Sequence, residues 1–406
     1  MIKQLFSISI IISLLTTIGC SVSTDLKSNQ NTSDITNPDT GISANIPNDL
    51  GNIYNSKNFN RYTRVLSPNG GSIHIVAQNK LTDEQIIRCR SILQHFLKNY
   101  ENSKYGSDKS SIANKMAENK AILCLLNGQD DGSNPIGDKV TGQPLYQNEI
   151  QVEGHSWYMH QNYEHRDATF EEILHFVHDY GIGVDYNGTP SPIGAAPDFQ
   201  AEIRAAQKNA LTKKLWGINS SSWIQELKTE NSLSQEYLAA IIDSYYGLWG
   251  AWEKSNTHGM WGIYISKTRF DISIKDPLGY TLMNNKFFHP YLTYNARIDA
   301  NLNGNFSLKF DPTKPYTHHS RYLKDITLLG VNNNTITVNE LDNNITGNTG
   351  INTVLFSGAS TEYSIKTNNN ITTIIDNVAN RDGKNILRSI EKIGFTNTII
   401  ELQKTN

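Results

Sequence analysis

The sequence predicts an α+β domain with a small mixed sheet and long helices, followed by an all-β module at the C-terminal end. Apolar and polar residues alternate over 72–77, as they do in a strand, and apolar residues recur at helical spacing over 82–100. From about Leu328, short runs of Ile, Val and Thr are separated by Asn and Gly turns. Strands that come first and helices that follow them are typical of the α+β class.

Residues 1–20 have the charged, apolar and small-residue order of a secretory signal, with Lys3 first and Gly19-Cys20 last. The end, Thr17-Ile18-Gly19-Cys20, resembles the bacterial lipoprotein signal, in which the Cys is lipidated; Leu is usual where Thr17 stands. The resemblance implies a lipid anchor at Cys20 and a location at the bacterial cell envelope, outside the cytoplasm. An ordinary signal with a chance Cys is the alternative. No later stretch contains eighteen apolar residues, so membrane contact is expected through the lipid anchor only.

The composition divides the rest of the chain into three parts. Residues 21–58 are rich in Ser, Asn, Thr, Asp and Gly and predict a flexible linker, because they offer little apolar surface to bury. Residues 59–327 form the predicted α+β domain, and residues 328–406 the β module. The net charge is −3 and there is no basic stripe, so nucleic acid is not an expected partner.

The elements of the α+β domain follow one another in a readable order. Thr82 is an N-cap before an acidic first turn, so a helix is expected to run from there to Tyr100. Asp167-Ala168-Thr169 begins a later helix, which Gly181 ends at the C′ position. The remaining predicted elements are strands over 121–126 and 145–152 and helices around 111–119 and over 197–215 and 234–246.

The helix that begins at Thr169 has an unusual charged face. At 100° per residue, two imidazoles and three carboxylates fall within an arc of about 120°. They belong to Glu171, Glu172, His175, His178 and Asp179. These carboxylates would repel one another, and a divalent metal bound by neutral His and ionised carboxylates explains the face economically. A solvated acidic face is the alternative, although such faces usually include Lys or Arg.

This element order, together with Glu171-Glu172-Ile173-Leu174-His175, resembles the zincin metallopeptidases. In that family, His-Glu-x-x-His on one helix supplies two zinc ligands and the general base, and a later helix supplies a third ligand. The resemblance implies that Glu172 is the base, that His175 binds the metal, and that Glu236 on helix 234–246 is the third ligand.

The sequence departs from the family at Glu171, which stands where the first ligand His belongs. A carboxylate can bind zinc, but its negative charge weakens the metal as a Lewis acid. The resemblance therefore leaves two interpretations. One is a zinc-dependent peptidase acting on a peptide or protein substrate, with His178 or Asp179 as additional ligands. The other is a scaffold that has lost catalysis and binds a surface ligand.

Other residues are further candidates for metal binding, sugar binding or surface presentation. His155 or His165 could reach the charged face from a neighbouring loop, and the aromatic residues Tyr245, Tyr246, Trp249, Trp252 and Trp261 could stack on sugars. Residues 350–358 and 380–395 are similar to β modules that flank calcium-binding repeats in secreted bacterial proteins. The calcium nonapeptide Gly-Gly-x-Gly-x-Asp is absent, so adhesion or surface presentation is expected there rather than calcium binding.

If Cys20 carries the lipid, the Cys20→Ser variant moves from the membrane fraction to the soluble fraction, because several acyl chains hold a protein at a bilayer that it otherwise leaves. Fractionation of cells followed by immunoblotting measures this. Ser21→Ala keeps the Cys and stays with the membrane. Equal membrane association of both variants contradicts the anchor.

Overall fold

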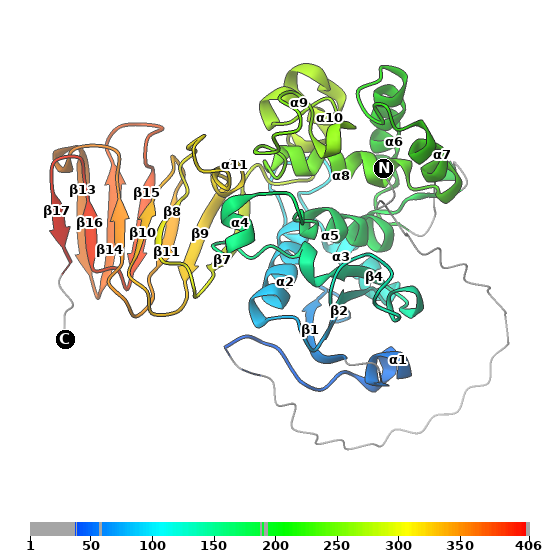
Figure 1. Cartoon of the computed structure of the whole chain (residues 1–406), viewed down its shortest axis with the longest axis horizontal. Coiled ribbons are helices and arrows are strands. Elements are labelled where there is room, and N and C mark those ends of the chain that lie inside the picture. Colours follow the sequence, from blue (N-terminus) through cyan, green and yellow to red (C-terminus); the bar gives the residue numbers. More distant parts are fainter. Residues whose placement is uncertain (1–36, 38, 57–58, 187–188, 191–193, 403–406) are drawn as a thin grey trace.

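The computed structural model describes residues 37, 39–56, 59–186, 189–190 and 194–402. Most helices lie in one run between Ser156 and Met283, after a first mixed sheet and before two later mixed sheets, which agrees with the α+β class. Figure 1 shows a first sheet with helices on one side of the molecule and a stack of strands, β7 to β17, on the other. The predicted signal with Cys20 lies outside the described residues.

The first sheet is mixed, as the sequence predicted. Its strands are β1 (Phe59–Leu66), β2 (Ser72–Gln78), β3 (Ile122–Leu126) and β4 (Gln143–Tyr146), in that order across the sheet. β1 is antiparallel to β2, and β2, β3 and β4 are parallel. The strand predicted over 145–152 ends instead at Tyr146, because a single helical turn, η3 (Gln147–Glu149), follows it.

Both faces of this sheet are covered. Ile75 and Leu125 point into the main core, and Val76 and Cys124 point into a smaller one on the other face. The smaller core includes Tyr54, which is fully buried on α1 (Asn52–Ser56). Ile42 and Tyr54, which the composition assigned to the linker, therefore belong to the two cores of the sheet.

Helix α2 (Asp83–Leu97) begins as predicted, with Thr82 and Gln85 in a capping box. It lies on the main-core side together with α3 (Ser110–Glu118) and α5 (Thr169–Val177). The helices that complete this half are α4 (Ser156–His160), α6 (Pro197–Thr212), α7 (Ser221–Glu230), α8 (Leu233–Tyr245), α9 (Arg269–Lys275) and α10 (Pro277–Met283). α8 packs directly against α5 and is buried along almost its whole length.

The end of α5 differs from the prediction. The α-helix ends at Val177 and continues as a π-helical turn, η4 (His178–Ile182), after which Gly183 has a φ of 99°. Gly181 is not the C′ residue. A Cβ there would lie 2.7 Å from Cγ2 of Ile112 on α3, so glycine at this position permits close packing of the two helices.

The strands from β7 onward form two sheets. Successive strands from β7 to β12 lie alternately in one sheet and in the other. One has the order β13-β14-β15-β11-β9-β7 and the other the order β17-β16-β12-β10-β8. Their bounds are β7 (Leu292–Ile298), β8 (Gly304–Ser307), β9 (Leu323–Leu328), β10 (Asn334–Thr337), β11 (Asn343–Thr346), β12 (Thr353–Leu355), β13 (Tyr363–Asn368), β14 (Ile371–Asp376), β15 (Lys384–Arg388), β16 (Lys392–Gly394) and β17 (Ile399–Glu401). A short helix, α11 (Thr317–Ser320), precedes β9. The two sheets therefore begin before residue 328.

A nine-residue spacing underlies this arrangement. Asn334, Asn343 and Asn352 begin or precede successive strands in alternate sheets, and all three side chains are buried. Two residues after each comes a buried apolar side chain, from Ile336, Ile345 and Val354 respectively. The three side chains bind backbone groups: Asn343 donates to the carbonyl of Lys324 on β9 at 3.0 Å, Asn334 accepts from the N–H of Gly304, and Asn352 donates to the carbonyl of Asn348.

A buried arginine joins the two halves of the protein. Arg88 on α2 donates to both oxygens of Asp167, at 3.0 and 2.7 Å, and to Glu153 at 3.1 Å. It also donates to the hydroxyl of Thr169, the first residue of α5, and Tyr294 on β7 donates to Glu153 at 2.7 Å. The Arg88, Glu153 and Asp167 side chains are at most 4% exposed. This network connects α2, the start of α5 and β7.

Removal of Arg88 leaves two buried carboxylates without their cation, so Arg88→Met is expected to lower the free energy of unfolding by about 3–5 kcal/mol. Urea unfolding followed by circular dichroism measures the change. Lys208→Met, at an exposed position of α6, is the matched control and changes stability by about 0.5 kcal/mol or less. Equal effects of the two substitutions contradict a stabilising network.

Candidate metal centre

Helices α5 and α8 bring three of the predicted site residues together. One ligand atom from each of Glu171, His175 and Glu236 lies within 4.8 Å of the other two. His175 Nε2 is 3.7 Å from Glu236 Oε1. The three side chains are 0%, 8% and 2% exposed, respectively. Residues 65 positions apart in the chain meet here because α5 and α8 pack against each other.

Each of these residues has a buried polar atom without a hydrogen-bond partner. The atoms are Glu171 Oε1, His175 Nε2 and Glu236 Oε2. Buried polar atoms in proteins are almost always hydrogen bonded, so three unpartnered ones in a single group need an explanation. One imidazole nitrogen and two carboxylate oxygens are a donor set that zinc and similar divalent ions accept. The residues present therefore fit a bound divalent metal.

Glu172 lies beside this group rather than within it. Its Oε2 accepts a hydrogen bond from Gln143 Nε2 at 2.7 Å and is 3.6 Å from His175 Nδ1. Its side chain is 18% exposed, more than those of the three grouped residues. Gln143 is on β4, the edge strand of the first sheet. Glu172 thus stands between the buried group and the solvent.

A positively charged side chain, which the sequence did not predict as part of the site, also lies beside the group. The guanidinium of Arg166 forms an ion pair with Glu171 Oε2 and lies 4.8 Å from the centre of the Trp261 ring. Its side chain is 11% exposed. The helix face itself carries no Lys or Arg, but Arg166 is three residues before α5 begins. An Arg immediately before an acidic first turn is a signal that could have identified it.

Burial and mutual repulsion shape the protonation of the group. Burial lowers the pKa of His175, but the carboxylates of Glu236 and Glu172 outweigh it and raise that pKa to about 10. Burial raises the pKa of Glu236 to about 8 and also raises that of Glu171. Without a metal, His175 and Glu236 hold protons at neutral pH. A metal that binds here must displace protons.

His178 and Asp179, the other two predicted ligands, do not join the group. His178 Nε2 lies 2.6 Å from Gln200 Oε1, and burial lowers the pKa of this imidazole to about 4. Asp179 Oδ1 accepts from Gln235 Nε2 at 2.7 Å. Both residues belong to the π-helical turn η4 and bind neighbouring helices instead.

The other candidates also lie elsewhere. His155 caps α4, and the ring of His165 packs against Trp157. Most of the aromatic residues considered for sugar stacking are core residues, with Tyr246 and Trp249 at most 1% exposed.

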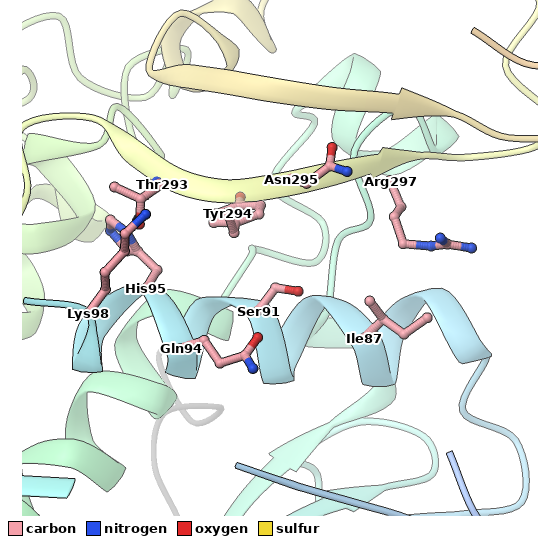
Figure 2. A pocket seen from close by; sticks show the side chains of 9 residues that line it. All are labelled: Ile87, Ser91, Gln94, His95, Lys98, Thr293, Tyr294, Asn295 and Arg297. Atoms are coloured by element: carbon pink, nitrogen blue, oxygen red, sulfur yellow. The ribbon is translucent and has the colours of Figure 1, made fainter. Parts of the chain in front are cut away.

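The described residues include a groove of about 310 Å³. It is separate from the group formed by Glu171, His175 and Glu236, here called the metal group. Figure 2 shows it between α2 and β7, with the side chains of Ser91 and Arg297 at its border. None of its lining residues is a predicted site residue.

Comparisons of the chain with protein family models, with curated proteins and with solved structures found no match. In the described part of the chain, no helix has the length and apolar character that crossing a membrane requires. The interpretation of the site therefore depends on its own geometry.

Loss of the imidazole donor is expected to weaken binding of zinc by about 100-fold or more in His175→Ala, because one of three ligand atoms is removed. Titration against a chelating dye measures the affinity. His178→Gln, three residues along the same helix segment, is the matched control and keeps the affinity within a few fold. The same loss in both variants, or no zinc binding by the unaltered protein, contradicts the site.

Proposed function

We propose that this chain is an exported, envelope-anchored, zincin-like protein whose buried Glu/His group binds a divalent metal, zinc being the expected ion, and which hydrolyses peptide bonds. The supporting observation is the convergence of ligand atoms from Glu171, His175 and Glu236, each of which also has a buried polar atom without a hydrogen bond, with Glu172 beside them. The anchor at Cys20 is part of the proposal, although that residue lies outside the described part of the chain.

Each residue has a definite task in this proposal. Glu171, His175 and Glu236 would hold the metal. A bound divalent ion polarises the peptide carbonyl and lowers the pKa of water. Glu172 takes the proton of the attacking water and passes it to the leaving amine. Gln143 holds one oxygen of Glu172 at 2.7 Å, so the carboxylate keeps one orientation while its other oxygen receives the proton.

The position of β4 supports a peptide as the substrate. β4 is the last strand of the four-stranded sheet, and its residue Gln143 contacts Glu172. An extended peptide that adds to the edge of a sheet gains backbone hydrogen bonds. A peptide beside β4 would pass close to Glu172, where its carbonyl is to be attacked.

One observation favours a second candidate, a surface binding protein without catalysis. The ion pair between Arg166 and Glu171 places a positive charge next to the buried carboxylates, which stabilises them in the absence of a metal. In this version the group holds a structural metal or none, and the protein binds a surface ligand or mediates adhesion.

If Glu172 is the base, Glu172→Gln retains zinc but loses peptidase activity by about 10²–10⁴-fold, because Gln cannot accept the proton. Cleavage of dye-quenched casein measures activity, and the same sample is assayed for bound metal. Glu226→Gln, on the exposed side of α7, is the control and keeps both properties.

The outcomes separate the two candidates. Loss of activity with zinc retained supports the peptidase. Zinc without activity in the unaltered protein supports the binding protein with a structural metal. Activity that survives in Glu172→Gln excludes Glu172 as the base.

A further inference from the structure

Glu171 stands where the zincin pattern has a neutral His, so it adds one negative charge to the metal group. Two carboxylates and one imidazole carry two negative charges, whereas catalytic zinc sites with two imidazoles and one carboxylate carry one. The additional charge weakens a divalent ion as a Lewis acid. It also makes the metal-free group more costly to bury.

The two oxygens of Glu171 face different partners. Oε2 accepts from the Arg166 guanidinium, whereas Oε1 is buried and unpartnered. The same carboxylate thus contacts a fixed cation and offers a ligand atom within 4.8 Å of those of His175 and Glu236. An arginine suits this role because its guanidinium stays protonated even when it is buried.

The surroundings hold Arg166 in place. Its guanidinium is stacked over the Trp261 ring and its side chain is 11% exposed, so water screens the ion pair only slightly. Glu149, Asp243 and Glu172 also attract it, but the direct contact is with Glu171. The pair is thus a structural unit of the metal group and not a surface salt bridge.

We propose that Arg166 and Glu171 act together as one electrically neutral metal donor, in which Arg166 cancels the charge that Glu171 brings in place of a histidine. Arg166 is a positioning residue: it binds one oxygen of Glu171 and directs the other toward the metal. The inference rests on the metal site of the proposed function. It explains how a group with this substitution retains the net charge of a site with two imidazoles and one carboxylate.

The test replaces the Arg166–Glu171 pair by a neutral histidine ligand in two steps, first Glu171→His and then Arg166→Gln. Glu171→His alone leaves Arg166 facing the metal without the intervening carboxylate, so zinc affinity falls by about 10–100-fold. Adding Arg166→Gln removes this repulsion, and the double variant is expected to return to within about threefold of the unaltered protein. Zinc affinity is measured by competition with a chelating dye.

A second measurement reads the ion pair without metal. In the presence of a chelator, Glu171→Gln leaves Arg166 buried without its partner and lowers the Tm by about 5–10 °C. Glu171→Gln combined with Arg166→Gln recovers most of that loss. If Glu171→His does not fold, zinc affinity is compared between Glu171→Gln and Glu171→Gln combined with Arg166→Gln. The inference expects the added Arg166→Gln to raise the affinity.

The results distinguish this inference from the proposed function. If the unaltered protein binds no zinc, the proposed metal site fails and the inference falls with it. If it binds zinc but the second substitution restores neither affinity nor Tm, the metal site stands and the role of Arg166 is overturned. Restoration of affinity by removal of a positive charge is not expected from an arginine that only supports the fold.

Discussion

The structure depends on one buried interaction, the bidentate ion pair between Arg88 on α2 and Asp167. Asp167 also accepts from the backbone N–H of Thr169 at 3.1 Å, so the pair fixes the first turn of α5. Glu153 extends the same network to Tyr294 on β7. The helix that carries the metal group is therefore positioned by α2 at its start and by α8 along its side. Displacement of α5 by one residue would rotate Glu171 and His175 by about 100° away from Glu236.

Much of this arrangement was predictable because it depends on local patterns. The helical period and Thr82 identified α2, and the charged residues of 171–179 identified α5 as a helix that contributes two members of the Glu171, His175 and Glu236 group. Glu236 was expected opposite His175 on a later helix, and the structure places the two residues 3.7 Å apart. These predictions succeeded because each required only the position of a residue on one element, or the pairing of two long helices.

Other features depend on tertiary contacts that one sequence does not display. The π-helical turn after Val177 moves His178 and Asp179 toward Gln200 and Gln235, whereas a regular helix would keep them on the predicted face. Arg166 lies outside the helix, so the periodicity that predicted the charged face does not include it. The nine-residue spacing of Asn334, Asn343 and Asn352 was present in the sequence, but irregular residues between the turns obscure it.

The two buried arginine clusters provide a comparison within one protein. In the first, Nε, Nη1 and Nη2 of Arg88 all donate and both oxygens of Asp167 accept, so the charges satisfy one another. In the second, Arg166 pairs with one oxygen of Glu171, while Glu171 Oε1, His175 Nε2 and Glu236 Oε2 have no hydrogen bond. The same fold can therefore satisfy buried carboxylates completely with an arginine and neighbouring donors. The second cluster leaves three buried atoms of metal-ligand type without a hydrogen bond, so its composition, unlike that of the first cluster, is one that could hold a cation.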